Sequence, residues 1–149
     1  MPLVIVLILA GFIGVAMIPS AEREAQLAVV AKREAAATRV VAYLDAVRQY
    51  RMDNPATTGA ISDLVIAMPS GTSKPANWSN VIFDGRLWVY EQAASYDQGL
   101  MAALGDQEAR NGVFVGARAG ASLATTAGYT TGISFPPAVP AGAIVMVTR

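Results

Sequence analysis

The chain has 149 residues, in which 11 Lys and Arg are balanced by 11 Asp and Glu. This length suits one membrane-spanning helix and one small domain. Because neither half of the chain is strongly basic, nucleic acid is not expected as a partner. Cys and His are both absent, which excludes disulfides, thiol nucleophiles, imidazole bases and the common zinc and haem ligand sets.

The first segment, residues 1–21, is almost wholly apolar and carries no charged side chain. A bilayer span needs about 20 apolar residues, and a helix satisfies its own backbone hydrogen bonds in lipid. We therefore expect an uncleaved N-terminal transmembrane anchor over residues 1–21. Two alternatives stay open. A secretory signal peptide is disfavoured by the lack of basic residues before the apolar run and by Pro19 near the only small-residue cleavage site, and a buried soluble helix is the other.

Three small residues in this segment, Ala10, Gly11 and Gly14, form a patch where another transmembrane helix could approach closely. Gly and Ala are also simply common in spans, so this patch is only a candidate for helix packing. Pro19 is expected to kink or break the helix where it leaves the membrane, because proline removes one intrahelical hydrogen bond and clashes with the preceding turn.

Residues 22–53 predict one long helix, since they are rich in good helix formers and contain no Gly or Pro. Its first half is dominated by Ala, with charges on all sides. We interpret this half as a stalk or a partner-facing segment, with Leu27, Val30 and Ala37 as candidate contact residues.

The second half of the predicted helix carries an apolar stripe at spacings of three and four, formed by Val40, Val41, Leu44 and Val47. Such a stripe must be buried against another element. We expect it to be the core spine of a small domain over residues 54–149, which this half of the helix completes.

A β-hairpin is the clearest local signal in that domain. Two β-rich runs, residues 80–83 and 86–91, flank Asp-Gly, which readily takes the positive φ angles of a two-residue turn. Trp88 and Tyr90 share one face of the second run, and we expect this face to pack on the apolar stripe of the helix as part of the core.

The remaining elements are a helix over residues 95–104, capped by Ser95 and ended by Gly105, and strands over residues 113–118, 132–135 and 143–148. The order of elements predicts an α+β fold: an N-terminal transmembrane helix continues into a long helix packed on a small, mainly antiparallel sheet.

No motif predicts catalysis. The carboxylate pairs Glu22/Glu24 and Asp106/Glu108 lie in polar surroundings that are typical of solvated faces and not of catalytic sites, and no phosphate loop, dinucleotide fingerprint or nucleophile motif is present. We expect a protein that is not an enzyme, without catalytic, cofactor-binding or metal-binding residues.

The layout resembles that of pilins, in which an apolar N-terminal helix continues into an amphipathic helix covered by a sheet. The chain departs from the pilin pattern where a mature pilin has Glu at its fifth position. Ile5 stands at position five, and Ala16 stands five residues after Gly11, although Gly11-Phe12 imitates the processing dipeptide. A pilin-like subunit is therefore the alternative reading.

The chain more closely resembles the PilM family of type IV (thin) pilus biogenesis proteins from conjugative plasmids. The segments that carry the resemblance run in order along the chain: TGAI (58–61), AMPSG (67–71), WSNVI (78–82), GRLWVY (85–90) and PAVPAG (137–142). The resemblance implies a single-pass inner-membrane protein with a periplasmic body, a non-enzymatic component of the pilus assembly base in a conjugation or secretion system. Its implied partners are other pilus-assembly proteins, and self-association as a homo-oligomer stays open.

The orientation implied by the family differs from the charge pattern. Arg23, Lys32 and Arg33 follow the apolar segment, and positive residues beside a span favour the cytoplasm. Only Arg23 lies close to the span, so we follow the resemblance and expect a periplasmic body. An exported binding domain, cut near Ala21, is a third alternative.

Overall fold

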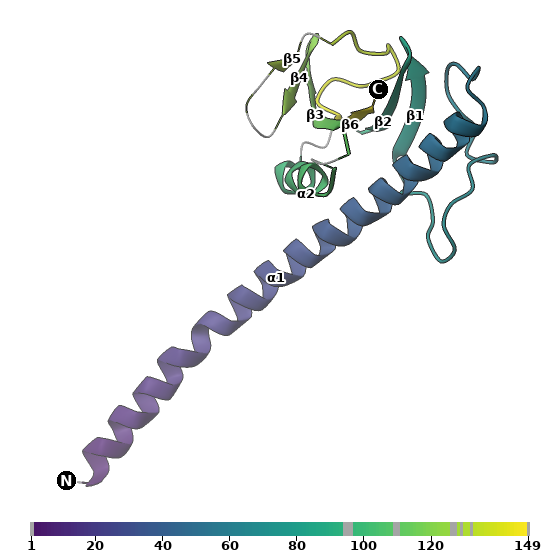
Figure 1. Cartoon of the computed structure of the whole chain (residues 1–149). Coiled ribbons are helices and arrows are strands. Elements are labelled where there is room, and N and C mark those ends of the chain that lie inside the picture. The colour runs from purple at the N-terminus through teal and green to yellow at the C-terminus, as the bar shows by residue number, and fades with distance from the viewer. Residues whose placement is uncertain are drawn as a thin grey trace. The chain divides into compact units, whose positions relative to one another are not determined.

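The structure is a computed structural model that describes the backbone of residues 2–93, 97–108, 111–125, 128, 130–131 and 133–148 (Figure 1). Side chains are described within residues 21–93, 97–107, 111–125, 128 and 133–148. The chain forms two compact units, Met1–Lys32 and Arg33–Arg149. The second unit begins within the long helix, and the boundaries predicted at residues 21 and 53 stay a prediction.

The first unit consists of the N-terminal part of helix α1 (Pro2–Asp53). Of the kink or break predicted at Pro19, the break is wrong, since α1 continues through this residue, and the kink stays a prediction. Residues 21–32 are exposed on every side of the helix. Among the residues whose side chains are described, no helix is long and apolar enough to cross a membrane. The anchor predicted for residues 1–21 lies almost wholly outside those residues and stays a prediction.

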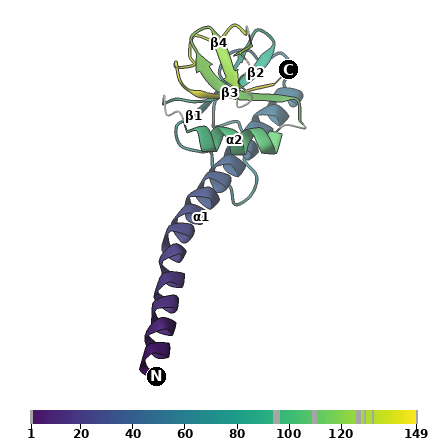
Figure 2. The ribbon, with the colours of Figure 1, turned by 90° about the vertical axis from the view of Figure 1, so that its left-hand side faces the viewer.

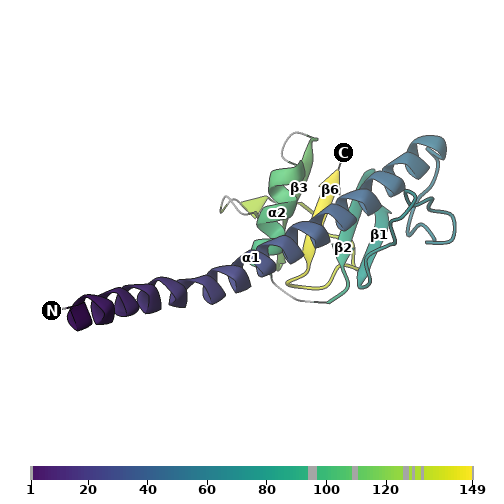
Figure 3. The same ribbon diagram turned by 90° about the horizontal axis from the view of Figure 1, so that it is seen from below.

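The second unit is built around one antiparallel sheet. In the part of the chain that the structure describes, six strands pair in the order β1-β2-β6-β3-β4-β5. Their bounds are β1 (Trp78–Phe83), β2 (Arg86–Glu91), β3 (Val113–Ala119), β4 (Ser122–Thr125), β5 (Thr130–Thr131) and β6 (Ile144–Thr148). The second half of α1 and helix α2 (Gln98–Glu108) lie on the same face of this sheet (Figure 3), and α2 packs against β3 (Figure 2).

The predicted hairpin is confirmed. β1 and β2 pair from Phe83 opposite Arg86 onward, and Asp84 and Gly85 between them have φ angles of 52° and 70°. Two successive positive φ angles define the type I′ turn, whose twist matches that of the flanking strands. β1 begins at Trp78, two residues before the predicted start.

One face of the sheet packs on α1. Val40, Leu44 and Val47 are fully buried there, and Val41 is partly buried at the margin of the same cluster. The sheet side chains that meet this stripe include Leu87 and Val89 of β2. The second half of α1 is therefore held to the sheet by an aliphatic layer.

The opposite face of the sheet buries the aromatic pair. Trp88 and Tyr90 are buried, but the expectation that they pack on the α1 stripe is wrong. They lie in a second cluster with Val139, Val145 and Val147, and the Trp88 ring lies 5.3 Å from that of Phe135. Because irregular chain between residues 133 and 143 covers this face, β2 is buried on both faces, and apolar alternation does not identify which face meets the helix.

Other elements differ from expectation. α2 continues through Gly105 to Glu108. Within the strand predicted over residues 132–135, residues 133–135 are irregular. β4 and β5 form between residues 122 and 131, where no strand was predicted. The terminal strand β6 lies in the middle of the sheet between β2 and β3.

The aliphatic layer predicts a large contrast between two identical substitutions. Leu44→Ala removes a fully buried side chain and should lower the free energy of unfolding by about 2–5 kcal/mol. Leu64→Ala, at a side chain that is 97% exposed, should leave it within about 0.5 kcal/mol. Urea denaturation followed by fluorescence measures both, since the two Trp residues are buried in the second unit. Equal losses would contradict the assigned core.

Candidate functional site

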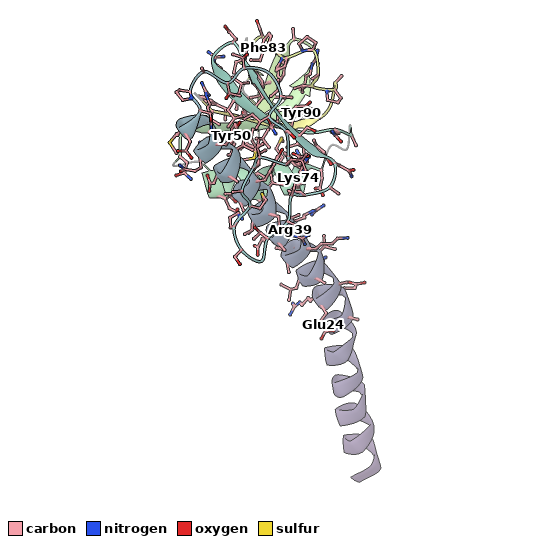
Figure 4. All side chains as sticks on the ribbon, turned by 90° about the vertical axis from the view of Figure 1, so that its right-hand side faces the viewer. Glu24, Arg39, Tyr50, Lys74, Phe83 and Tyr90 are labelled. Atoms are coloured by element: carbon pink, nitrogen blue, oxygen red, sulfur yellow. The ribbon has the colours of Figure 1, made fainter. Side chains whose placement is uncertain are left out.

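An exposed apolar face on α1 is the first candidate contact surface. In the first unit Leu27 is 67% exposed and Val30 is 49% exposed. Residues three apart lie on the same side of a helix, and the side chains of this stretch, near the labelled Glu24, project from the helix (Figure 4). Val29 is also exposed, about 200° around the helix from Leu27. Leu27 and Val30 therefore form one exposed apolar face, which we call the stalk face.

The other predicted contact residues are not part of the stalk face. Ala37 does not belong to the stalk face, because it is fully buried in the core of the second unit. The spacing pattern alone could not show this, since the helix passes from one unit to the other without a change in its regular structure. The candidate packing residues Ala10, Gly11 and Gly14 lie outside the described side chains, so their role stays a prediction.

A charged contact fixes the start of the second unit to α2. Arg33 donates from Nε to Oδ2 of Asp97 at 3.2 Å, and its Nη2 lies 3.2 Å from Oδ1. Asp97 also caps α2, because its Oδ1 accepts from the backbone N–H groups of Gly99 and Leu100 at 2.9 and 3.1 Å. The sequence predicted Ser95 as the cap and Asp97 in the first turn, whereas in the structure Asp97 itself caps α2. Ser95 lies outside the described residues.

Glycine makes this contact possible. A Cβ at Gly99 would lie 2.6 Å from the Cζ of Arg33, so a side chain there would displace the guanidinium from Asp97.

The contact with Arg33 also lowers the pKa of Asp97. Desolvation by burial alone would raise it, but the hydrogen bonds from the Leu100 N–H and Arg33, together with the charge of Arg33, hold the pKa of this carboxyl below its ordinary value.

A buried polar cluster holds the long loop between α1 and β1. The Tyr43 hydroxyl donates to Oδ1 of Asp63 at 3.1 Å and accepts from Nδ2 of Asn80 at 2.7 Å. The Asn80 side chain also accepts from the Ile61 N–H at 2.9 Å and donates to the Ile61 carbonyl at 3.0 Å. Lys74 (Figure 4) lies 2.5 Å from Oδ2 of Asp63 and above the Tyr43 ring. The loop is thereby tied to both α1 and β1.

The same loop also pairs with the outer edge of β1. Gly59 and Ile82 exchange backbone hydrogen bonds of 3.1 and 2.8 Å. Gly59 has a φ of 76°, a conformation that glycine adopts without strain. The Asn80 side chain continues this pairing to Ile61, so a polar side chain extends the contact that the backbone begins.

The buried polar side chains around Tyr43 hold the loop in place. Desolvation by burial, reinforced by the nearby carboxylate of Asp63, raises the pKa of Tyr43 well above its ordinary value, so its hydroxyl stays neutral at physiological pH. Burial likewise raises the pKa of Tyr90. Among the side chains that the structure describes, no three carboxylates converge as metal ligands. The expectations that the chain is not an enzyme and binds no cofactor stay predictions.

Comparison with known proteins identifies relatives. The sequence model of the PilM family matches residues 5–147. The chain is similar in fold to a crystal structure described as PilM from Escherichia coli B7A, with a TM-score of 0.60 and 22% identity over 79% of this chain and 92% of that chain. It is also similar to one described as PilM from Pseudomonas aeruginosa 2192, with a TM-score of 0.45 and 26% identity over 77% and 92% of the two chains. No curated protein matches.

The Arg33–Asp97 contact predicts a pH-dependent stability. Because the folded pKa of Asp97 is lowered, its ionised form stabilises the fold above the unfolded pKa of about 3.9, and this contribution is lost as pH falls through the lower folded value. Asp97→Asn keeps the capping oxygen but removes the charge. The variant should be less stable than wild type at neutral pH, and the difference should shrink in acid.

Urea denaturation at a series of pH values measures this difference. Asp106→Asn, at an exposed position of the same helix, is the matched control and should not lower stability at neutral pH. A deficit of Asp97→Asn that stays constant from neutral pH into acid would contradict an electrostatic role for Asp97.

Proposed function

We propose a function from one premise: the chain belongs to the PilM family. The family's name associates it with type IV pilus biogenesis. On this premise the chain is a single-pass inner-membrane component of the pilus assembly base, in a conjugation or secretion system, and acts by binding other assembly proteins without catalysis. The match over residues 5–147 carries the proposal, because it includes both units.

The membrane part of the proposal rests on residues 1–21, which are apolar and uncharged. The anchor would tether the second unit on the periplasmic side. A reporter enzyme that is active only in the periplasm, fused after Arg149 of the full chain, should be active. If only a cytoplasmic reporter at the same position is active, the proposed periplasmic orientation is wrong. If salt releases the chain from membranes, the proposed transmembrane anchor is wrong.

The binding part of the proposal rests on the stalk face. Leu27 and Val30 are branched aliphatic side chains exposed in the first unit, and full burial of such a side chain contributes about 1.5–3 kcal/mol. Their flanking charges of both signs, such as Arg23 and Glu24, suit the polar rim that surrounds an apolar contact. We propose that other pilus-assembly proteins cover this face.

Charge at the stalk face should therefore disrupt assembly. The double variant Leu27→Glu and Val30→Glu should reduce co-purification of other pilus-assembly proteins from membranes by about tenfold or more. Each substitution removes the binding free energy of a buried apolar side chain and places a charge in the contact. The unfolding of the second unit should not change, because neither residue belongs to it.

The control is Ala25→Glu, an exposed position about 200° around the helix from Leu27. Co-purification should survive this change. If Ala25→Glu is as damaging as the double variant, the effect belongs to charge on the helix in general and not to the stalk face.

A pilin-like subunit is the second candidate, favoured by the way in which the second half of α1 buries Leu44 and its neighbours under the sheet. This candidate requires the chain in sheared filaments, whereas an assembly component stays with membranes. The third alternative, an exported domain cut near Ala21, requires a shortened chain, so mass spectrometry that finds the intact Met1 terminus would remove it.

A further inference from the structure

A pocket of about 590 Å³ lies in the second unit, where the C-terminal end of α1 meets the ends of three strands. Leu87 of β2 and Thr148 of β6 lie opposite one another and form the floor, together with Asn111 and Gly112, which precede β3. Arg51 and Met52, from the last turn of α1, form part of the wall. The lining residues that the structure describes all belong to the second unit, whereas the stalk face belongs to the first.

The pocket combines positive charge with an apolar floor. Arg48 and Arg51 line it beside Met52, Pro55 and Leu87. No Asp or Glu lines it among the residues that the structure describes. A ligand with negative charge and an apolar part would therefore match both components of the lining.

Backbone carbonyls orient both guanidinium groups. Nη2 of Arg51 donates to the carbonyl of Gly85, in the turn of the hairpin, at 2.5 Å. Nη2 of Arg48 donates to the carbonyl of Asn111 at 3.3 Å, and its Nη1 lies 3.3 Å from Oδ1 of Asp45. Asp45 offsets the charge of Arg48, whereas the Gly85 carbonyl holds the Arg51 guanidinium in place without cancelling its charge. A guanidinium has five N–H donors, so Arg51 keeps donors for a further partner.

Arg51 is the group on which the site depends. Within the described part of the chain, no carboxylate lies within 4.0 Å of its guanidinium. Its side chain is already ordered by the Gly85 carbonyl, so less conformational entropy is lost when a carboxylate binds. A planar guanidinium matches a carboxylate with two parallel hydrogen bonds.

A segment of another protein suits this pocket better than a small molecule does. Met52 at the mouth is 67% exposed, and Asn111 and Gly112 are exposed as well. Small ligands normally bury about 70–90% of their surface, whereas exposed residues at the mouth of a pocket suit contact with a larger partner. Arg and Met are enriched at protein interfaces, where Arg often contributes a large share of the binding energy.

We propose that this pocket docks an acidic peptide segment of another protein. A Glu or Asp side chain of that segment pairs with Arg51, and an adjacent apolar side chain packs on Met52 and Leu87. The docking site gives the second unit a partner surface of its own, and it does not require the membrane anchor or the stalk face.

The test titrates the full-length chain with a blocked pentapeptide, acetyl-Gly-Leu-Glu-Leu-Gly-amide, up to millimolar concentration. NMR spectra of chain labelled with ¹³C at the methionine methyl groups report binding at Met52. Met101 and Met146 are fully buried in the core and act as internal references. The Met52 signal should shift and saturate while those of Met101 and Met146 stay in place, and the matched Gln peptide should bind at least about tenfold more weakly.

Three variants test the assignment. Arg51→Gln should weaken binding of the Glu peptide at least about tenfold. Pro55→Glu, at an exposed residue of the pocket lining, should do the same by placing negative charge in the pocket while keeping the Met52 signal. Arg39→Gln, which removes the same charge from an exposed position of α1 (Figure 4), should leave binding unchanged.

Three results would overturn the proposal. Equal binding of the Glu and Gln peptides would show that no carboxylate is recognised. An equal loss with Arg39→Gln and Arg51→Gln would show attraction to the general positive charge of the helix. The absence of any shift at Met52 with millimolar peptide would show that the pocket does not dock the segment.

Discussion

Val40, Leu44 and Val47 leave water when α1 meets the sheet, and the rest of the second unit depends on this burial. Each such side chain contributes about 1.5–3 kcal/mol when fully buried. α1 covers one face of the sheet together with α2, and irregular chain around Val139 covers the other. The sheet is thus enclosed on both sides, and its central strand β6 is buried along its whole length.

Local signals in the sequence predicted the elements that local physics decides. The stripe through Leu44 has helical spacing, and Asp84-Gly85 takes the positive φ angles of the hairpin turn. Such local signals do not show which strands pair when they are far apart in the sequence. The terminal strand lies at the centre of the sheet because β2 and β3 both pair with it, and the face on which Trp88 lies depends on a segment almost fifty residues later, near Phe135.

The candidate surfaces show the same limit. The exposure of Leu27 follows from its place among small and charged residues, whereas Ala37 looks similar in sequence and is buried because the second unit begins at Arg33. Arg51 lies four residues after Val47 and seven after Leu44, on the side of the helix that carries the buried stripe. Its place in a pocket depends on the carbonyl of Gly85, which the hairpin turn brings to it from a distant part of the sequence.

The loop tied down by Tyr43 and Asn80 also limits how the domain can join an assembly. An open strand edge presents backbone N–H and C=O groups on which an extended segment of another chain can add itself. At β1 the exchange between Gly59 and Ile82 occupies the outer backbone groups of Ile82, and the side chain of Asn80 holds Ile61 beside the same strand. An extended segment of another chain therefore cannot pair with β1 at Ile82 without displacing Gly59.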